Sequence, residues 1–359
     1  MGVDKTNFYH DEPLFGLDIG HSSIKVMQLE VAHGVKPRVL GYGVSLEYPG
    51  DTIVEGIIVK KNELSRALYD LFKRGLVGNI STNRVACTIP TSHTFSRPMK
   101  LPPMEDDAIS EAVHLEVEQY VPLPAESLYI DYEISRKSSE GVELLMVATP
   151  KKIIDSYVNF LETMGLQPVA LEPTMNAASR LFSLADASHN DPSILIDFGS
   201  VSIDIAVFDQ TMFVNSTVSG GSDILNNLIA KRLKISTGEA YALKSLYGIG
   251  VSEKREELLA VTVPMLEDLV REVRKTMRYY VERSAQAHRK IVQLIILGGG
   301  ANMPGLSEYL ANELKMPARV LDPWQTLDFG GLEAPDIIRQ AIYLTVAGEA
   351  LLTPGEIFV

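Results

Sequence analysis

Two short motifs combine the residue types that bind phosphate and magnesium. Asp18-Ile19-Gly20 and Asp197-Phe198-Gly199 each end an apolar run of strand character and lead into a tight turn. A glycine at the bend lets backbone N–H groups approach phosphate oxygens, and an aspartate supplies the hard oxygen that Mg²⁺ prefers. One Asp-x-Gly is common as a turn cap, so the inference depends on the pair. The pair predicts a polyphosphate held between two turns, with Asp18 and Asp197 directed toward a metal ion.

Hydroxyl and amino groups near both turns extend this set. Ser22, Ser23 and Lys25 follow the first turn, whereas Ser200 and Ser202 follow the second. The serines can donate hydrogen bonds to phosphate, and Lys25 can pair with its charge. Lys25 also fits the polar face of an alternating strand, so both roles stay open.

Two further glycine clusters lie where strands meet helices. Gly220-Gly221 opens a predicted helix, and Gly298-Gly299-Gly300 follows the apolar strand 291–297. The N-terminus of a helix favours anions, and a run of glycines after a strand permits close approach of a ribose or adenine ring. These clusters are therefore expected to line the same site.

The elements around these motifs occur twice. Residues 15–30 are predicted to form a hairpin of two strands, and the same pattern of strand, Asp-x-Gly, turn and strand returns from residue 193. This spacing is far too long for a repeat array, so it indicates a duplicated domain. Between the copies, residues 84–168 alternate strands and helices as a compact α+β insertion.

The bulk composition restricts the class of protein. A chain of 359 residues with 46% hydrophobic content can bury more than one core. The net charge of −13 repels nucleic acid, and the single cysteine, Cys87, excludes an internal disulfide and a thiolate metal cluster. No stretch approaches about 18 uncharged apolar residues. We therefore expect a soluble cytoplasmic protein that does not bind nucleic acid.

With these motifs in place, the chain resembles the superfamily of actin, sugar kinases and heat-shock chaperone ATPases. Residues 17–26 are similar to its phosphate-one motif, 196–200 to phosphate-two and 296–306 to its adenosine motif, in the same order. The resemblance implies an α/β protein with the actin-like ATPase fold, built from two duplicated RNase H-like halves. It also implies that ATP or ADP with Mg²⁺ binds between them.

The same resemblance assigns site residues and subdomains. Residues 171–178 resemble the helix before phosphate-two, where relatives carry a residue that orients the attacking water, so Glu172 and Asp197 are the candidate catalytic residues. A glutamate next to Pro173 also suits a helix start. The expected nucleotide-binding set is Gly20, His21, Ser22, Ser23, Lys25, Gly199, Ser200, Ser202, Gly220, Gly221, Lys244, Gly298, Gly299, Gly300 and Met303.

Within the superfamily the chain resembles the PilM family of type IV pilus assembly, with the FtsA family second. Residues 84–168 look like the subdomain IC that both families share, and 219–223, 240–244 and 340–348 resemble PilM segments. An FtsA would be expected to end in an amphipathic membrane helix, unlike residues 351–359. The resemblance gives subdomain IA as 1–83 and 169–190, IC as 84–168 and the second half (IIA/IIB) as 191–359. A C-terminal helix at about 335–352 would return to IA.

The implied function is a cytoplasmic scaffold at the inner membrane. It would bind ATP and, on its IA/IC surface, the cytoplasmic tail of a PilN-like membrane protein, with pilus motor ATPases and a second copy as further partners. His21 and Tyr241 replace the family's usual residues, and the second turn has few glycines. The last feature favours binding, with at most weak ATPase activity. The alternatives are an FtsA-like division protein, a small-molecule kinase, for which no base aspartate is evident, and an adaptor that binds no nucleotide.

Overall fold

The chain folds around two large β-sheets with matching strand order. The structure, a computed structural model, describes residues 12–32, 34–46, 48–186, 190–284 and 289–353. The first sheet has the order β11-β7-β1-β2-β3-β6, and the second has the order β14-β13-β12-β15-β16. The strands of the first sheet are β1 (Phe15–Ile19), β2 (Ile24–Glu30), β3 (Arg38–Ser45), β6 (Leu76–Gly78), β7 (Arg84–Ile89) and β11 (Gln167–Pro173). Those of the second are β12 (Ser193–Phe198), β13 (Ser202–Asp209), β14 (Thr211–Ser219), β15 (Gln293–Leu297) and β16 (Ala318–Val320).

Both sheets repeat one pairing scheme. β1 pairs antiparallel with β2 and parallel with β7, and β12 pairs antiparallel with β13 and parallel with β15. A third antiparallel strand follows each hairpin, β3 in the first sheet and β14 in the second. This correspondence confirms the predicted duplication.

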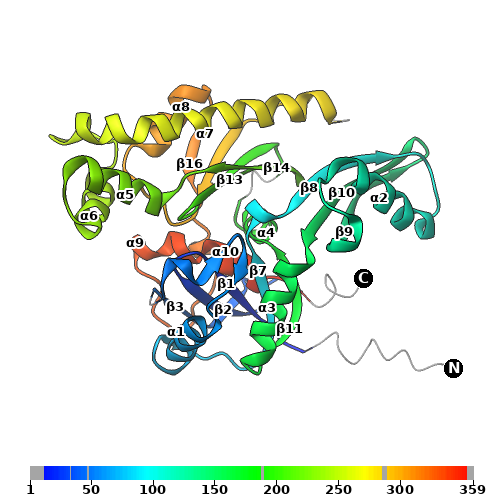
Figure 1. The fold of residues 1–359 in the computed structure, drawn as a ribbon, viewed down its shortest axis with the longest axis horizontal. Helices are drawn as coiled ribbons and strands as arrows, with labels where there is room; N and C mark the ends of the chain where they lie inside the picture. The colour runs from blue at the N-terminus through cyan, green and yellow to red at the C-terminus, as the bar shows by residue number, and fades with distance from the viewer. Residues whose placement is uncertain (1–11, 33, 47, 187–189, 285–288, 354–359) are drawn as a thin grey trace.

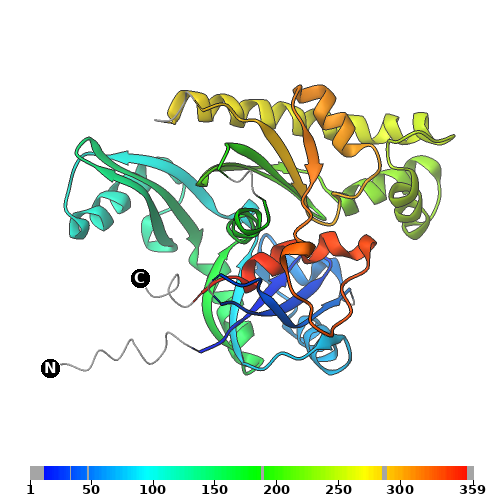
Figure 2. The same cartoon turned by 180° about the vertical axis from the view of Figure 1, so that it is seen from behind.

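Helices cover both faces of each sheet, which explains why the central strands are apolar on both sides. One core joins the first sheet to α1 and α3, and another joins the second sheet to α5–α8. A third core contains α4 and α10 together with strands of both sheets, so these helices lie between the sheets (Figures 1 and 2). The helices are α1 (Lys61–Arg74), α3 (Lys151–Thr163), α4 (Thr174–Ala185), α5 (Ser222–Leu233), α6 (Thr237–Tyr247), α7 (Arg255–Arg283), α8 (Leu306–Leu314), α9 (Ile337–Gln340) and α10 (Leu344–Ala350).

The C-terminal helix α10 approaches its neighbours closely. A Cβ on Gly348 would lie 1.9 Å from the carbonyl oxygen of Ala177 in α4. A Cβ on Gly16 in β1 would lie 2.8 Å from the carbonyl oxygen of Val346. Both positions therefore require glycine, and α10 (Leu344–Ala350) packs directly on the first sheet.

A smaller sheet and one helix project from this body. The sheet has the order β8-β10-β9, and α2 (Asp106–Tyr120) packs on it through Ile109, Val113 and Val117. Its strands are β8 (Phe95–Leu101), β9 (Leu128–Ser138) and β10 (Gly141–Pro150). We call this part, residues 95–150, the inserted unit. β7 and α3, which the sequence-based boundary of 84–168 counted with the insertion, pack in the first sheet and its core.

β11 and β14 were not predicted from the sequence. α7 begins at Arg255 and contains Pro264, and α8 begins at Leu306. Within the described ranges, no helix has the length and apolar character needed to cross a bilayer.

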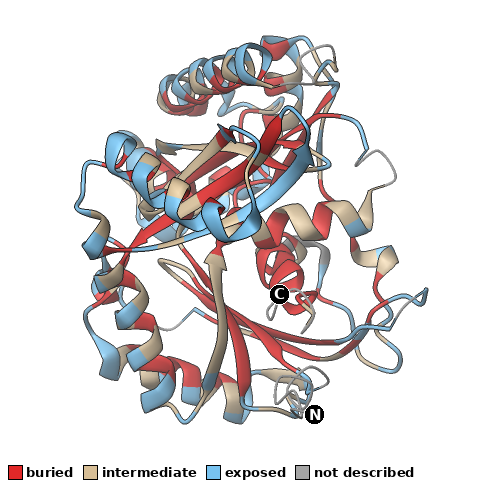
Figure 3. Ribbon diagram, turned by 90° about the vertical axis from the view of Figure 1, so that its right-hand side faces the viewer, coloured by how far each residue is buried: buried red, intermediate tan, exposed pale blue. Residues whose placement is uncertain are grey.

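Burial follows these layers. The central strands of the two large sheets, β1, β2, β7, β12, β13 and β15, are buried along most of their length, whereas the outward faces of α2 and α7 are exposed (Figure 3). The ends of β1 and β12, which carry the two aspartates, lie inside this buried region because α4 and α10 pack beside them. The candidate site is therefore built on rigid strand ends rather than on exposed loops.

Candidate functional site

The first turn is fixed by hydrogen bonds within it and by Tyr48. The N–H of Gly20 donates to the carbonyl oxygen of Ser23 at 2.9 Å, which closes the bend between β1 and β2. The hydroxyl of the buried Tyr48 donates to the carbonyl oxygen of Gly20. Burial and the nearby charge of Asp18 raise the pKa of Tyr48, so it stays a neutral donor. Tyr48 was not predicted, because it lies outside the motif.

Asp18 lies in a row of polar side chains across the first sheet. It is aligned with Lys25 on β2 and with Thr88 on β7, which in turn is aligned with Glu172 on β11. The Lys25 Nζ lies 2.8 Å from Asp18 Oδ2, and the Thr88 hydroxyl donates to Oδ1 at 2.8 Å. Asp18 is thus a buried carboxylate with its charge matched, and Lys25 is its partner rather than a residue of a solvated strand face.

The second hairpin repeats this register with a different partner. Asp197 on β12 is aligned with Asp204 on β13, where the first hairpin has Lys25. Burial and the charge of the other acid raise the pKa of Asp197 to about 7, and burial raises that of Asp204 to about 6. The charge of Asp18 also raises the pKa of Asp197, and Lys25 lowers it, so the two hairpins lie within electrostatic reach.

Asp204 is a site residue that sequence reasoning missed. Its side chain is buried and accepts a hydrogen bond from the Thr217 hydroxyl on β14. The signal was present in the sequence, because Asp204 follows Asp197 by the same interval that separates Lys25 from Asp18. The strand register is needed to see that this interval places Asp204 beside Asp197, as it places Lys25 beside Asp18.

The two glycine clusters close around the second turn. The N–H groups of Ser222 and Asp223 donate to the carbonyl oxygens of Gly199 and Ser200 at 2.8 and 2.9 Å. Gly221 has a φ of +136°, and a Cβ there would lie 2.6 Å from the Ser200 oxygen. Backbone hydrogen bonds therefore hold the start of α5 against the turn.

The triple glycine packs behind the end of β12. Gly298 has a φ of +86°, and a Cβ on it would lie 2.1 Å from Asp197 Oδ1. The N–H of Gly300 donates to the carbonyl oxygen of Phe198 at 2.9 Å. Gly299 lies beside Ile342. Gly298 thus leaves the space that the Asp197 carboxylate occupies.

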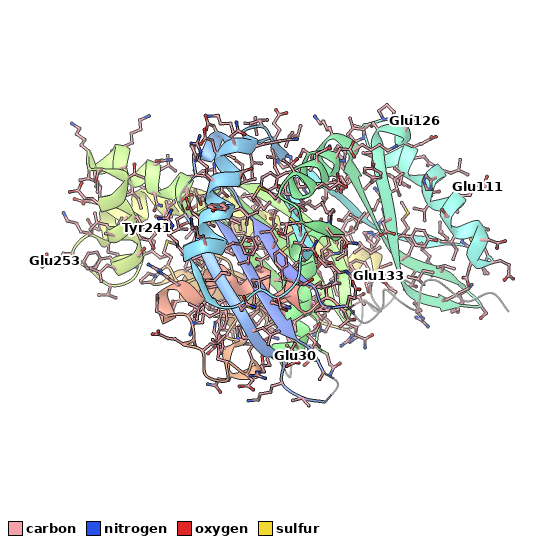
Figure 4. The ribbon with its side chains drawn as sticks, turned by 90° about the horizontal axis from the view of Figure 1, so that it is seen from below. Glu30, Glu111, Glu126, Glu133, Tyr241 and Glu253 are labelled. Carbon is pink, nitrogen blue, oxygen red and sulfur yellow. The ribbon has the colours of Figure 1, made fainter. Side chains whose placement is uncertain are left out.

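Lys244 lies beneath the start of α5. It is buried, and its ammonium donates to the carbonyl oxygen of Ser222 at 3.1 Å and to the Ser222 hydroxyl. Burial lowers the pKa of Lys244 to about 8, although Asp223 opposes this shift. The Tyr241 ring is about half exposed, with its centroid 5.7 Å from the Lys244 Nζ. Figure 4 shows Tyr241 far from Glu111 and Glu126 of the inserted unit.

The remaining residues of the predicted set have mixed positions. His21, Ser22, Ser200 and Ser202 are half-buried on the two turns, and His21 Nε2 would lie 3.0 Å from a Cβ on Gly50. Met303 is buried in the core of the second half, against Gly248, and not on the turns.

Glu172 is held in an ion pair on β11 and is not at a helix start, as the sequence had suggested. Arg180 of α4 binds both carboxylate oxygens at 2.6 and 2.8 Å, and its Nη1 also donates to the carbonyl oxygen of Gly348. Glu349 of α10 is completely buried beside this pair. Burial, followed by the charge of Glu172, raises the pKa of Glu349 well above its usual range.

This arrangement suits a polyphosphate with a magnesium ion. The turns combine glycine backbone with serine hydroxyls, and Lys25 and Lys244 supply positive charge. Among the described residues, no group of three or more acidic, histidine or cysteine side chains gathers as a metal cage. Two aspartates nevertheless fit Mg²⁺, which keeps several waters and takes other ligands from phosphate oxygens.

A separate groove lies between the inserted unit and the second half. Its volume is about 440 Å³, and it runs between β8 and β14, which are edge strands of their sheets. The Asn215 amide on β14 donates to the Ser96 hydroxyl on β8 at 3.1 Å, so the two walls touch. Thr91 and Thr276 are among the other residues that line it. We refer to this feature as the edge-strand groove.

Similarity to known structures agrees with the duplicated architecture. The chain resembles the structure titled PilM-PilN type IV pilus biogenesis complex with a TM-score of 0.81 and 19% identity, over 95% of this chain and 98% of that one. For MreB 5 of Spiroplasma citri bound to AMPPNP, the TM-score is 0.55 at 12% identity, with 94% and 95% covered. For EutJ from Carboxydothermus hydrogenoformans, it is 0.54 at 15% identity, with 94% and 88% covered. The protein therefore has the actin-like ATPase fold.

The sequence identifies the family within this fold. Residues 16–353 match the profile of the family described as type IV pilus assembly protein PilM. The match includes both hairpins, the inserted unit and α10. The chain belongs to the PilM family of type IV pilus assembly proteins.

Proposed function

We propose that this protein is a cytoplasmic nucleotide-binding scaffold of the inner-membrane platform that assembles type IV pili. It holds ATP or ADP with Mg²⁺ between the two hairpin turns and binds the cytoplasmic tail of a PilN-like membrane protein. One observation carries the nucleotide part: two buried aspartates at equivalent strand ends lie close enough for the charge of Asp18 to raise the pKa of Asp197. Two matched acids facing each other across glycine turns suit a cation-bridged polyphosphate.

Each group near the turns has a role in this proposal. With a nucleotide bound, Asp18 and Asp197 would hold Mg²⁺, and the turn N–H groups and serines would hold the phosphates. Lys244, buried beneath the start of α5, adds positive charge near Gly220 and Gly221, while Tyr241 stacks on the base. Glu172 orients the attacking water only weakly, since Arg180 already occupies both of its oxygens. The cleft therefore acts as a slow switch.

The partner proposal depends on the edge-strand groove, which lies between the inserted unit and the second half and so differs from the IA/IC surface that the resemblance implied. Two edge strands facing each other have unpaired backbone groups that an extended peptide can use, which is a common way to bind a tail. The similar structure titled as a PilM-PilN complex supports a PilN-like tail as the occupant. Binding that tail would keep the protein at the inner membrane. Contacts with motor ATPases or a second copy would then occur on the remaining surface.

The nucleotide part is tested by calorimetry of ATP with Mg²⁺. We expect wild-type protein to bind, and Asp18→Ala and Asp197→Ala each to weaken binding at least tenfold. Asp70→Ala, an exposed change on α1, is the matched control and should bind as wild type does. Absence of both binding heat and a thermal shift in the wild type would remove the nucleotide switch from the proposal.

The partner part is tested separately with a synthetic peptide of the PilN-like tail from the same organism. Ser96→Arg fills the edge-strand groove and should abolish peptide binding in fluorescence anisotropy. Ser135→Arg, on the exposed strand β9 and outside the groove, should leave binding unchanged. Equal peptide binding by both variants would contradict this location.

A further inference from the structure

Strand β14 connects the edge-strand groove with the proposed nucleotide site between the two hairpin turns. Thr217 and Asn215 are among the residues that line the groove. Side chains alternate along a strand, and strand pairing aligns Thr217 with Asp204 on β13, which is aligned with Asp197 on β12. One straight row across three strands thus connects a wall of the groove with the second turn of the cleft.

The contact at this junction is a direct hydrogen bond. Thr217 is exposed in the groove, whereas Asp204 is buried, and the Thr217 hydroxyl donates to Asp204 Oδ1. A buried carboxylate depends strongly on its few donors, because water cannot replace them. The position of the Asp204 side chain beside Asp197 therefore depends on a residue that an occupant of the groove would touch.

A second lining residue lies near the first acid. Thr91 lines the groove, and its hydroxyl accepts the Met175 N–H at 3.1 Å and contacts the Thr174 hydroxyl at 2.9 Å at the start of α4. Thr91 follows the end of β7 by two residues, and Thr88 of β7 donates to Asp18. The groove is therefore connected to the surroundings of Asp18 through the chain, and to Asp204 through a hydrogen bond.

We propose that Thr217 is a positioning residue that couples the groove to the cleft, so that a bound tail peptide and Mg²⁺-ATP strengthen each other's binding. This inference rests on the proposed function, since it needs both ligands. A peptide lying over Thr217 excludes the water that competes for its hydroxyl and keeps that hydroxyl on Asp204. The acid pair is then held in one arrangement, and thermodynamic linkage requires the same gain for the peptide when nucleotide is bound.

The test measures the affinity for Mg²⁺-ATP with and without a saturating concentration of the synthetic tail peptide. In the wild type we expect the peptide to tighten nucleotide binding about fivefold, the lower range of measured couplings. Thr217→Val keeps the shape and removes the donor, so the two affinities should agree within twofold. Thr217→Ser restores the donor and should restore the coupling, which a purely structural role for Thr217 would not require.

Two controls separate the possible failures. Thr211→Val, on the same strand but outside the groove lining, should keep the wild-type coupling. Coupling that persists in Thr217→Val, or independent binding of both ligands in the wild type, would overturn the inference. Failure of the wild type to bind either ligand would instead overturn the proposed function. Thermal unfolding of every variant verifies that it is folded.

Discussion

The two hairpins have the same register and opposite electrostatics. In the first, Asp18 faces Lys25, and attraction together with the Thr88 hydroxyl satisfies the carboxylate. In the second, Asp197 is aligned with Asp204; burial and the charge of Asp204 raise the pKa of Asp197, whereas burial raises that of Asp204. In the first hairpin the charge of Asp18 is therefore balanced by Lys25 without a ligand. In the second hairpin two acidic side chains lie together, and a bound cation would reduce their repulsion. The two hairpins therefore have the same strand register but different residues opposite the shared aspartate position, Lys25 in the first and Asp204 in the second.

The largest expected effect is predicted for loss of the ion pair between Asp18 and Lys25 in the first hairpin. Asp18→Asn leaves Lys25 buried without a counter-charge, so the free energy of unfolding should fall by about 4 kcal/mol. Urea denaturation at pH 7.5 measures it. Asp70→Asn, which removes an exposed acid paired with Arg74, is the control and should cost less than about 0.5 kcal/mol. A cost for Asp18→Asn no larger than the control's would mean that the ion pair does not hold this hairpin.

The next effect concerns the glycine that makes room for the second acid. Gly298→Ala adds a Cβ 2.1 Å from Asp197 Oδ1 at a positive φ, so we expect a loss of about 3 kcal/mol. Gly20→Ala is the matched change on the first side. Its φ is not positive, and its Cβ would meet the flexible Lys25 Nζ at 3.0 Å, so about 1 kcal/mol is expected. Equal losses would show that the two sides are packed alike.

The third prediction is an increase in stability, because the substitution removes one of the two acids in the second hairpin. A carboxyl whose folded pKa is raised contributes stability that is complete below its unfolded pKa and is lost as the pH rises through the folded value, here about 7. Asp197→Asn should therefore stabilise the nucleotide-free protein by about 2 kcal/mol at pH 8 and by little at pH 4. Denaturation at both pH values measures this. Destabilisation at pH 8 would contradict the proposed repulsion.

The smallest expected effect is predicted for Glu349, a buried carboxyl group beside the first sheet. Glu349 is buried beside the Glu172–Arg180 pair, with its pKa raised well above the usual range by burial. Glu349→Gln should raise the stability by about 1 kcal/mol at pH 8, because the uncharged amide avoids the cost of a buried charge. The gain should vanish below the unfolded carboxyl pKa. Glu308→Gln, exposed on α8, should change nothing at either pH.

The features that the sequence predicted best are those with strong local signals. Apolar strands ending in Asp-x-Gly located both hairpins, and the alternation of strands and helices indicated the inserted α+β unit. β14 was missed because its sequence, TMFVNSTVS, is rich in small polar residues, and β11 because prolines occupy two of its seven positions. Glu172 was assigned to a helix for the same reason, since the strand continues through Pro173 before α4 begins.

The parts of the site that escaped prediction depend on contacts between distant segments. Asp204, Tyr48 and Glu349 carry no motif, and each acquires significance only from the strand or helix that packs against it. Met303, which the motif included, turned inward because the helix after it begins three residues later, at Leu306. Residue type therefore predicts the chemistry, whereas register and packing decide which side chains reach it.

The position of α10 has a consequence for the order of folding during synthesis. This helix fills the space between the sheets against β1, which lies at the opposite end of the described chain, and glycines at 16 and 348 allow the contact. The first sheet can therefore pair its early strands while translation continues, but one of its faces stays uncovered until α10 leaves the ribosome. Until then that apolar face is uncovered, and the arrangement of the two hairpins is completed only after α10 has packed.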